Sequence, residues 1–356
     1  MSRPIQAKIS LKALSENLSR VRDFAPHSGI LSVIKADAYG HGFLEAAGAL
    51  SGSDGFALLD LADALKLREA GFRQKIVLLE GCFSVDELRA ASENGIDVVV
   101  HCMEQIGMIE SANLPGKIGV FLKCNTGMNR LGFRPEVYPE ALSKLERLES
   151  IGEIVLMTHF CCADGTAGVK AQMDVFGAAT SAMKYPKSLA NSAALIRYPE
   201  TRTEWVRPGI MLYGASPFID EDAGSLGLVP AMTLSSKIIA VQQINPGEGI
   251  GYGPMFRADK PMRIGIVACG YADGYPRHAP NGTPVLVGGR LTGTLGRVSM
   301  DMLYVDVSKM PDAGIGTEVV LWGEGLPVEE VATACGTISY ELLCAIAPRV
   351  PISYYY

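Results

Sequence analysis

The sequence has no run of 18 consecutive apolar residues, the length that a membrane-spanning helix needs. Its first residues, Met1-Ser-Arg-Pro-Ile-Gln-Ala-Lys8, also lack the apolar stretch of a secretory signal peptide. Both absences disfavour membrane insertion and secretion. We therefore expect a cytoplasmic protein without a membrane partner.

Clustered positive charge is missing as well. The chain has 32 Lys and Arg residues against 38 Asp and Glu residues, a net charge of -6, and its basic residues form no local cluster. A nucleic-acid partner would require a basic face to bind phosphates. The composition therefore disfavours nucleic acid and favours a small-molecule substrate.

The eight cysteines show no C-x-x-C spacing and most stand among apolar residues. This pattern is not that of a zinc site, so we expect no metal. We interpret the cysteines as reduced core residues of a cytosolic protein. Low-complexity tracts and internal repeats are also absent, apart from the alternation of strands and helices.

The first two-thirds of the chain contain eight short apolar runs with β-rich composition, at 30–34, 55–59, 76–80, 97–100, 118–122, 153–158, 188–190 and 209–213. Helical patterns separate most of them, for example Leu61–Gly71, in which apolar residues share one face and Gly71 provides the stop. Alternation of this kind predicts a parallel sheet. Eight units in this length favour an α/β fold with a closed (β/α)8 barrel over an open doubly wound sheet.

From about residue 230 the pattern changes to strands without long helices between them, at 233–244, 262–268, 284–287 and 318–322. Turn signals such as Asn281-Gly282 and Gly288-Gly289 separate the runs. We therefore predict two domains: a barrel over 1–228 and a mostly antiparallel β domain over 229–356.

Lys35 ends the first apolar run and begins a glycine-containing turn. A buried, unpaired lysine is costly when charged, so its pKa falls and its nitrogen becomes a nucleophile that can form a Schiff base with a carbonyl cofactor. Taken alone, a lysine at a strand end more often reaches solvent. The polar residues at the other predicted strand ends favour the reactive lysine instead.

Active sites of barrels lie at the carboxyl ends of the strands. Polar side chains stand at the ends of several of the predicted strands: Lys123 and Arg130 after the fifth, His159 after the sixth, Ser192 after the seventh and Arg207 at the opening of the eighth. His159 alone would usually be a core histidine, and Arg207 alone a surface ion-pair partner. Their matching positions in the topology indicate one site instead.

The ordered set of motifs resembles the alanine racemases, the fold type III enzymes that depend on pyridoxal 5'-phosphate (PLP), over almost the whole chain. The motifs that carry this resemblance are Val33–Gly42, Asn125–Phe133, Met157–Phe160, Asn191–Ala194, Arg207–Ile210, Gly251–Gly253, Gly296–Asp301 and Ser339–Glu341. The family combines an N-terminal barrel with a C-terminal β domain, which agrees with the patterns above.

The resemblance implies a racemase that interconverts L-alanine and D-alanine with two bases. Lys35 would hold PLP and act as one base, and Tyr252, between two glycines, would act as the other from the second subunit of a homodimer. Without the resemblance, Gly251-Tyr-Gly253 would be interpreted as a tight turn.

The resemblance also implies further roles. Arg207 would face the cofactor ring nitrogen, His159 would lie beside the ring, and Arg130 would approach the cofactor and the substrate carboxylate. The cofactor phosphate would be bound by the hydroxyls of Tyr39, Ser192 and Tyr340 and the amides of Gly209 and Ile210. Tyr271, Met300 and Asp301 would bound the substrate, and Lys123 would be carbamylated in place of pointing to solvent.

Two other functions remain open. A fold type III decarboxylase would share the barrel and the PLP lysine but usually carries a cysteine motif in its C-terminal half that is absent here. A non-catalytic PLP-binding protein would normally lack the β domain. Whether a racemase of this kind supplies D-alanine for peptidoglycan or degrades it, and whether it accepts serine, is not encoded in these motifs.

Overall fold

The computed structural model describes residues 3–253 and 255–356 and divides the chain into two units. The barrel unit comprises Leu18–Ala38 and Phe43–Leu212, and the sheet unit comprises the residues up to Asn17, Tyr39–Gly42 and Tyr213–Tyr356. The predicted ranges 1–228 and 229–356 differ from these units. At the N-terminal edge the difference arises because the first strand, β1 (Gln6–Ser10), is hydrogen-bonded to β10 and β16 of the C-terminal sheet.

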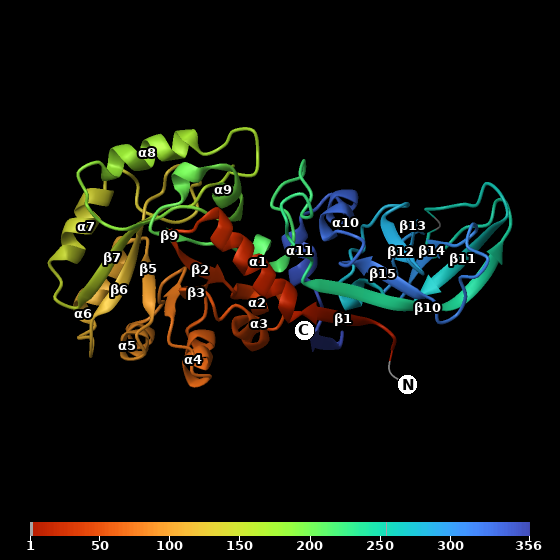
Figure 1. Ribbon diagram of the computed structural model, residues 1–356, viewed down its shortest axis with the longest axis horizontal. Coiled ribbons are helices and arrows are strands. Elements are labelled where there is room, and N and C mark those ends of the chain that lie inside the picture. Colours follow the sequence, from red (N-terminus) through yellow and green to blue (C-terminus); the bar gives the residue numbers. More distant parts are fainter. Residues whose placement is uncertain (1–2, 254) are drawn as a thin grey trace. The chain divides into compact units, whose positions relative to one another are not determined.

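Eight parallel strands close the barrel in sequence order, as the alternating pattern predicted (Figure 1). They are β2 (Gly29–Val33), β3 (Gly55–Leu58), β4 (Lys75–Leu78), β5 (Asp97–Val100), β6 (Ile118–Lys123), β7 (Ile151–Met157), β8 (Lys187–Ser188) and β9 (Trp205–Val206). Strand β2 closes the ring by pairing with β9, Gly29 opposite Trp205. The open doubly wound sheet is therefore excluded.

Helices alternate with these strands along the chain, and α4 to α8 lie on the outside of the barrel (Figure 1). They are α1 (Leu11–Phe24), α2 (Lys35–Gly40), α3 (Phe43–Ala49), α4 (Leu61–Glu69), α5 (Val85–Glu93), α6 (Met103–Ser111), α7 (Tyr138–Glu146), α8 (Lys170–Thr180) and α9 (Ser192–Arg197), with short 3-10 helices η1 (Pro199–Thr201) and η2 (Ile210–Tyr213). Local sequence explains several ends: Gly71, with φ of 91°, follows α4, and the hydroxyl oxygen of Ser84 accepts the Glu87 amide at the start of α5.

The prediction of the last two barrel strands was partly wrong. The seventh strand covers 187–188, not 188–190, and the eighth covers 205–206, whereas residues 210–213 of the predicted strand form η2. Pro208 has no backbone N–H for a sheet, and the Leu212 amide donates to the Gly209 carbonyl oxygen over 2.9 Å, which starts a helical turn. Arg207 therefore follows the eighth strand directly.

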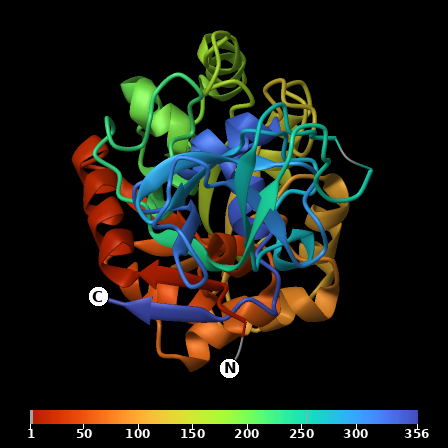
Figure 2. The same cartoon turned by 90° about the vertical axis from the view of Figure 1, so that its right-hand side faces the viewer.

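The sheet unit contains an eight-stranded sheet in the order β11-β14-β13-β12-β15-β10-β1-β16. Its remaining strands are β10 (Met232–Ile244), β11 (Met262–Val267), β12 (Pro284–Val287), β13 (Arg290–Leu295), β14 (Leu303–Asp306), β15 (Glu318–Trp322) and β16 (Ile352–Tyr355), with helices η3 (Tyr271–Asp273), α10 (Val328–Cys335) and α11 (Ser339–Cys344). The sheet is antiparallel, as predicted, except that β1 and β16 run parallel, side by side near the two ends of the chain (Figure 2).

Two of the residues in the C-terminal tyrosine triplet have a structural explanation. Tyr354 and Tyr355 belong to β16 and lie opposite Ile9 and Ser10 of β1. Aromatic residues are favoured in strands, so this segment extends the sheet at its edge.

The prediction that the cysteines are core residues was only partly correct. Cys82, Cys124, Cys269 and Cys335 are buried, but Cys161 and Cys344 are exposed. No helix within the described residues is both long and apolar enough to cross a membrane.

Candidate active site

The barrel unit places the predicted polar side chains at one rim. Lys35 lies two residues after β2, Lys123 is the last residue of β6, His159 lies two residues after β7, and Arg207 follows β9. The carboxyl ends of parallel barrel strands share one end of the barrel. The eight barrel-unit residues that we predicted for the site are Lys35, Lys123, Arg130, His159, Ser192, Arg207, Gly209 and Ile210.

Lys35 opens an unusual backbone segment. The four residues Ala36–Tyr39 all have φ between 51° and 54°, so α2 is a left-handed helical turn built mainly from residues with side chains. Each such residue costs about 1–2 kcal/mol relative to a right-handed conformation. The turn is held by the Ala38 amide, which donates to the Ile34 carbonyl oxygen over 3.0 Å, and by the Phe43 amide, which donates to Asp37 Oδ1 over 2.8 Å. Strain of this kind concentrates at functional sites.

Positive charge accumulates around Lys123, which is buried. Burial, followed by the charges of Arg207, Arg130 and Lys35, lowers the pKa of Lys123 to about 8. The alternative in which Lys123 points to solvent is therefore excluded. Burial and the same group of cations lower the pKa of His159 well below its ordinary value, so this imidazole is neutral at pH 7. The rim thus carries a group of positive charges suited to an anion.

Arg207 is the most constrained of these cations. Its side chain is buried, Nη1 donates to Ser188 Oγ over 2.6 Å, and Nη2 donates to the carbonyl oxygens of Thr158 over 2.7 Å and Leu189 over 3.3 Å. Burial lowers the pKa of Arg207 to about 10, which leaves it protonated at neutral pH. This environment excludes the surface ion pair that the residue type alone would suggest. Neither Thr158 nor Ser188 was identified from sequence, because their role appears only once the strands are adjacent.

The predicted phosphate-binding residues are divided between the two units. In the barrel unit, Ser192 Oγ accepts the amides of Gly209 over 2.9 Å and Met211 over 3.5 Å at the beginning of η2. In the sheet unit, the rings of Tyr39 and Tyr340 have centroids 6.0 Å apart. Burial, with a contribution from Tyr340, raises the pKa of Tyr39 well above its ordinary value, so its hydroxyl keeps its proton and can donate to an anion.

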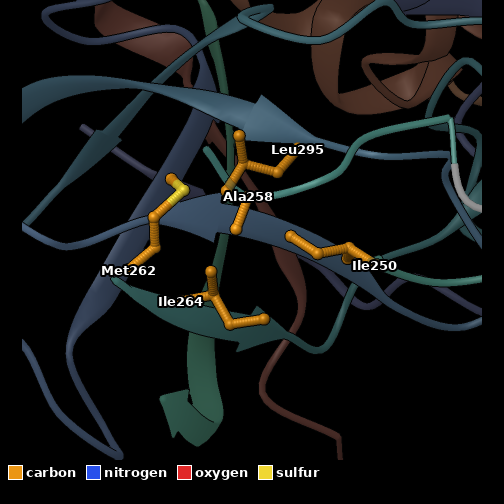
Figure 3. Packing of buried hydrophobic residues seen from close by; sticks show 5 residues of the cluster. All are labelled: Ile250, Ala258, Met262, Ile264 and Leu295. Carbon is orange, nitrogen blue, oxygen red and sulfur yellow. The ribbon is translucent and has the colours of Figure 1, made fainter. Parts of the chain in front are cut away.

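Tyr252 lies in a loop of the sheet unit whose two sides meet in an antiparallel bridge between Gly249 and Arg257. Its side chain is 76% exposed. Gly251 and Gly253 have φ of 67° and 53°, which accounts for the glycines that flank the tyrosine. Ile250 and Ala258, next to this bridge, belong to a buried cluster with Met262, Ile264 and Leu295 of the neighbouring strands (Figure 3).

Tyr271 and Met300 lie on adjoining segments of the sheet unit. The Tyr271 amide donates to the Ser299 carbonyl oxygen and the Ala272 amide to that of Met300, both over 3.0 Å. Gly270 makes this approach possible, because a Cβ there would lie 2.3 Å from the Met300 carbonyl oxygen.

A buried carboxylate, Asp273, secures this arrangement and was not identified from sequence. It accepts hydrogen bonds from Arg3 over 2.8 Å, Arg349 over 2.7 Å and the Gly270 amide over 2.9 Å. Arg349 also pairs with Asp301 over 2.8 Å. The partners come from opposite ends of the chain, so no local sequence signal indicates the cluster.

Comparison with known proteins identifies the family. Residues 9–217 match the N-terminal domain family of alanine racemase and residues 231–354 match its C-terminal domain family. An alanine racemase of Nitrosospira multiformis is 57% identical over 353 residues, which is 98% of this chain and 99% of the relative.

Solved structures agree. The biosynthetic alanine racemase of Pseudomonas aeruginosa superposes with a TM-score of 0.97 at 43% identity, covering 100% of both chains. An alanine racemase of Acinetobacter baumannii superposes with a TM-score of 0.93 at 40% identity, covering 99% of this chain and 100% of the other. The chain therefore belongs to the alanine racemase family, whose members are amino-acid isomerases.

Proposed function

We propose that this racemase is PLP-dependent and interconverts L-alanine and D-alanine by a two-base mechanism, with Lys35 and Tyr252 as the bases. One observation carries the proposal. Lys35 lies at the carboxyl rim of the barrel with Lys123, Arg130 and Arg207, close enough for their positive charges to act on one another. A reactive amine among cations suits a cofactor with both a carbonyl group and a phosphate. Within the described residues, no cluster of three or more His, Cys, Asp or Glu side chains is arranged to hold a metal ion.

The donors in the structure fit PLP. Lys35 would bind its carbonyl carbon, His159 and Arg207 would flank its ring, and Arg130 would approach its phenolic oxygen. By resemblance, its phosphate would take the hydroxyls of Tyr39, Ser192 and Tyr340 and the amides of Gly209 and Ile210. The Gly209 amide now donates to Ser192 Oγ, so it would have to turn to the phosphate. When bound, PLP supplies an electron-withdrawing ring that acidifies the hydrogen on the α-carbon of an amino acid.

Arg207 would limit how strongly the cofactor ring withdraws electrons. It is held by three acceptors, and it retains its protons at neutral pH. Arg207 would therefore donate a hydrogen bond to a ring nitrogen that faced it but would not give up a proton. Such an arginine would favour return of a proton to the α-carbon of the substrate.

Racemisation requires proton transfer on both faces of a planar carbon, and two bases on opposite sides provide it. Lys35 would serve one face. The exposed Tyr252 side chain is available to enter the site of a second subunit, so we propose a homodimer with composite sites. Tyr271, Met300 and Asp301 would then border the substrate carboxylate and restrict the site to alanine or a side chain of similar size.

Lys123 is proposed to be carbamylated. With a pKa of about 8, its amine is neutral in roughly one molecule in ten at pH 7. The neutral nitrogen attacks carbon dioxide, an N–C bond forms and one proton is released. The resulting anion offsets the charges of Arg130 and Arg207 and would orient Arg130.

Such an enzyme in the cytoplasm would either supply D-alanine for peptidoglycan or degrade it. The similar Pseudomonas aeruginosa enzyme is a biosynthetic alanine racemase, which favours the first role by similarity.

The test is exchange of the α-proton of L-alanine in heavy water by PLP-loaded protein, with optical rotation followed in the same sample. We expect deuterium at the α-carbon together with loss of rotation, and loss of both effects in Lys35→Ala. Exchange without inversion would refute the two-base mechanism. Bound cofactor without exchange would instead favour a non-catalytic PLP-binding protein.

The composite site has its own test. Lys35→Ala and Tyr252→Phe subunits should each be inactive as homodimers, and mixed dimers should recover activity because one of their two sites is intact. Mixed dimers that form but stay inactive would refute the shared site.

A further inference from the structure

A buried amide side chain links two of the loops that carry site residues. Gln172 is the third residue of α8, and only 7% of it is exposed. The loop after β6 carries Arg130, and the loop after β7 carries His159. None of the motifs that resemble the family includes Gln172.

Gln172 uses its whole hydrogen-bonding capacity on these loops. Its Oε1 accepts the Cys161 amide over 2.9 Å and the Cys161 thiol over 3.3 Å. Its Nε2 donates to Thr126 Oγ1 over 2.9 Å and to the His159 carbonyl oxygen over 3.1 Å. A primary amide has two donors and two acceptor positions, so this one has no capacity left.

The network continues from Thr126 toward Arg207. Thr126 Oγ1 and Thr158 Oγ1 lie 2.8 Å apart, and the Thr158 hydroxyl donates to the Cys124 carbonyl oxygen over 3.0 Å. Since Thr158 has only one hydroxyl hydrogen, Thr126 is the donor in the pair. The Thr158 carbonyl oxygen in turn accepts from Arg207. The donors thus run in one direction from Gln172 through the two threonine hydroxyls to the Cys124 carbonyl oxygen, and Arg207 donates to the Thr158 backbone from the other side.

We propose that Gln172 is a positioning residue for the racemisation, which holds the His159 and Arg130 loops in register without touching the substrate. This inference rests on the proposed function. An amide is suited to the position because one end must accept and the other must donate. A leucine offers neither, and an ionised glutamate offers only acceptors, which would oppose the His159 carbonyl oxygen.

The chain contains a matched control. Gln105 is also the third residue of a barrel helix, α6, and is also 7% exposed. Its Oε1 accepts the His101 amide over 2.8 Å and its Nε2 donates to the Glu80 carbonyl oxygen over 2.9 Å. It therefore bridges two strand-end loops in the same way, but loops without a predicted catalytic residue.

The experiment compares Gln172→Leu, Gln172→Glu and Gln105→Glu with the wild type, measuring kcat and KM for alanine from pH 6 to pH 9 and the temperature of unfolding. We expect Gln172→Leu to lower kcat about tenfold at every pH, the effect of losing a well-placed interaction, with a smaller change in KM. In Gln172→Glu the deficit should be largest at high pH and should shrink as the pH falls, because protonation of the buried carboxyl restores one donor. Gln105→Glu should lower stability comparably but should lack this pH signature in kcat.

A second readout does not depend on catalysis. Loss of the acceptor at Gln172 frees the Cys161 thiol, so protein without cofactor should show faster modification of Cys161 in Gln172→Leu than in Gln105→Glu. The proposal would be overturned if Gln172→Leu left both kcat and thiol reactivity unchanged. It would also be overturned if the two glutamate variants lost kcat equally and without pH dependence. A wild-type chain that exchanges no α-proton would refute the proposed function instead, and the thiol readout would still test whether Gln172 fixes the loops.

Discussion

Ser188, the last residue of β8, accepts a 2.6 Å hydrogen bond from Nη1 of Arg207, which follows the neighbouring strand β9. Both side chains are buried. Replacing Ser188 with Ala should lower the free energy of unfolding by about 2 kcal/mol, since a buried charged donor loses its acceptor. Urea denaturation measures the change. Ser181→Ala, at an exposed position, should stay within about 0.5 kcal/mol of wild type, and equal effects of the two substitutions would contradict the buried hydrogen bond.

Because the turn after Lys35 is left-handed, we predict that a glycine in it stabilises the protein against unfolding. Ala36 is exposed and has φ of 53°, so Ala36→Gly relieves about 1–2 kcal/mol of strain while adding about 0.5–1 kcal/mol of chain entropy in the unfolded state. We expect a net gain of roughly 0.5–1 kcal/mol in the free energy of unfolding. The exposed Ala178 in the right-handed helix α8 is the control, because glycine there should cost about 1 kcal/mol. A loss at both positions would argue against the left-handed conformation.

Asp273 should be sensitive to the loss of its charge. Asparagine has one acceptor oxygen in place of two, so Asp273→Asn cannot retain all the hydrogen bonds from Arg3, Arg349 and Gly270. We expect a loss of about 2 kcal/mol, moderated because the two arginines remain partly hydrated. Asp312→Asn breaks an exposed pair with Arg290 and should have no measurable effect on denaturation.

The lowered pKa of His159 predicts that acid reduces the stability of the fold. Because its pKa is lowered in the folded state, below about pH 6.5 the unfolded chain binds a proton at this residue that the folded chain does not. Stability should therefore fall as the pH drops, by up to about 1.4 kcal/mol per pH unit from this group. Thermal unfolding between pH 5 and pH 8 should show a shallower decline for His159→Gln than for wild type. Parallel curves would contradict a neutral buried imidazole.

The adjacent thiols of Cys161 and Cys162 predict a distinctive titration. Their sulfur atoms lie 3.3 Å apart and Cys161 is exposed. An aromatic disulfide should first react with Cys161, which releases one coloured thiolate and leaves a mixed disulfide on Cys161. The Cys162 thiol should then attack that mixed disulfide, which releases the second coloured thiolate as the Cys161–Cys162 disulfide forms. Burial and the neighbouring thiol raise the pKa of Cys161, so the reaction should accelerate with rising pH. In a Cys344→Ser background, Cys162→Ser should reduce the release to one thiolate.

Much of the barrel could be predicted from sequence because six of its strands are long enough for apolar runs to stand out between helical patterns. The last two, Lys187–Ser188 and Trp205–Val206, have only two residues each, too few for any periodicity. The left-handed turn also gave no signal, since alanine has no preference for positive φ. Tertiary hydrogen bonds impose that conformation.

The candidate site residues at strand ends could be selected from sequence because topology brings the ends of parallel strands together. The residues that hold them were not. Gln172, Thr158 and Asp273 act through partners far along the chain, and polar residues of these types are common in loops and helices everywhere. Only the fold shows which of them are buried and what they contact.

The position of β1 between β10 and β16 has a consequence for the order in which the protein matures on the ribosome. Strand β1 is made first, yet both neighbours come from beyond residue 230, whereas the barrel unit is complete by residue 212. The barrel can fold during synthesis while the first strand remains without its native neighbours. The sheet that carries Tyr252 is complete only after residues 352–355 have emerged, so the sheet unit reaches its native pairing when translation is nearly finished.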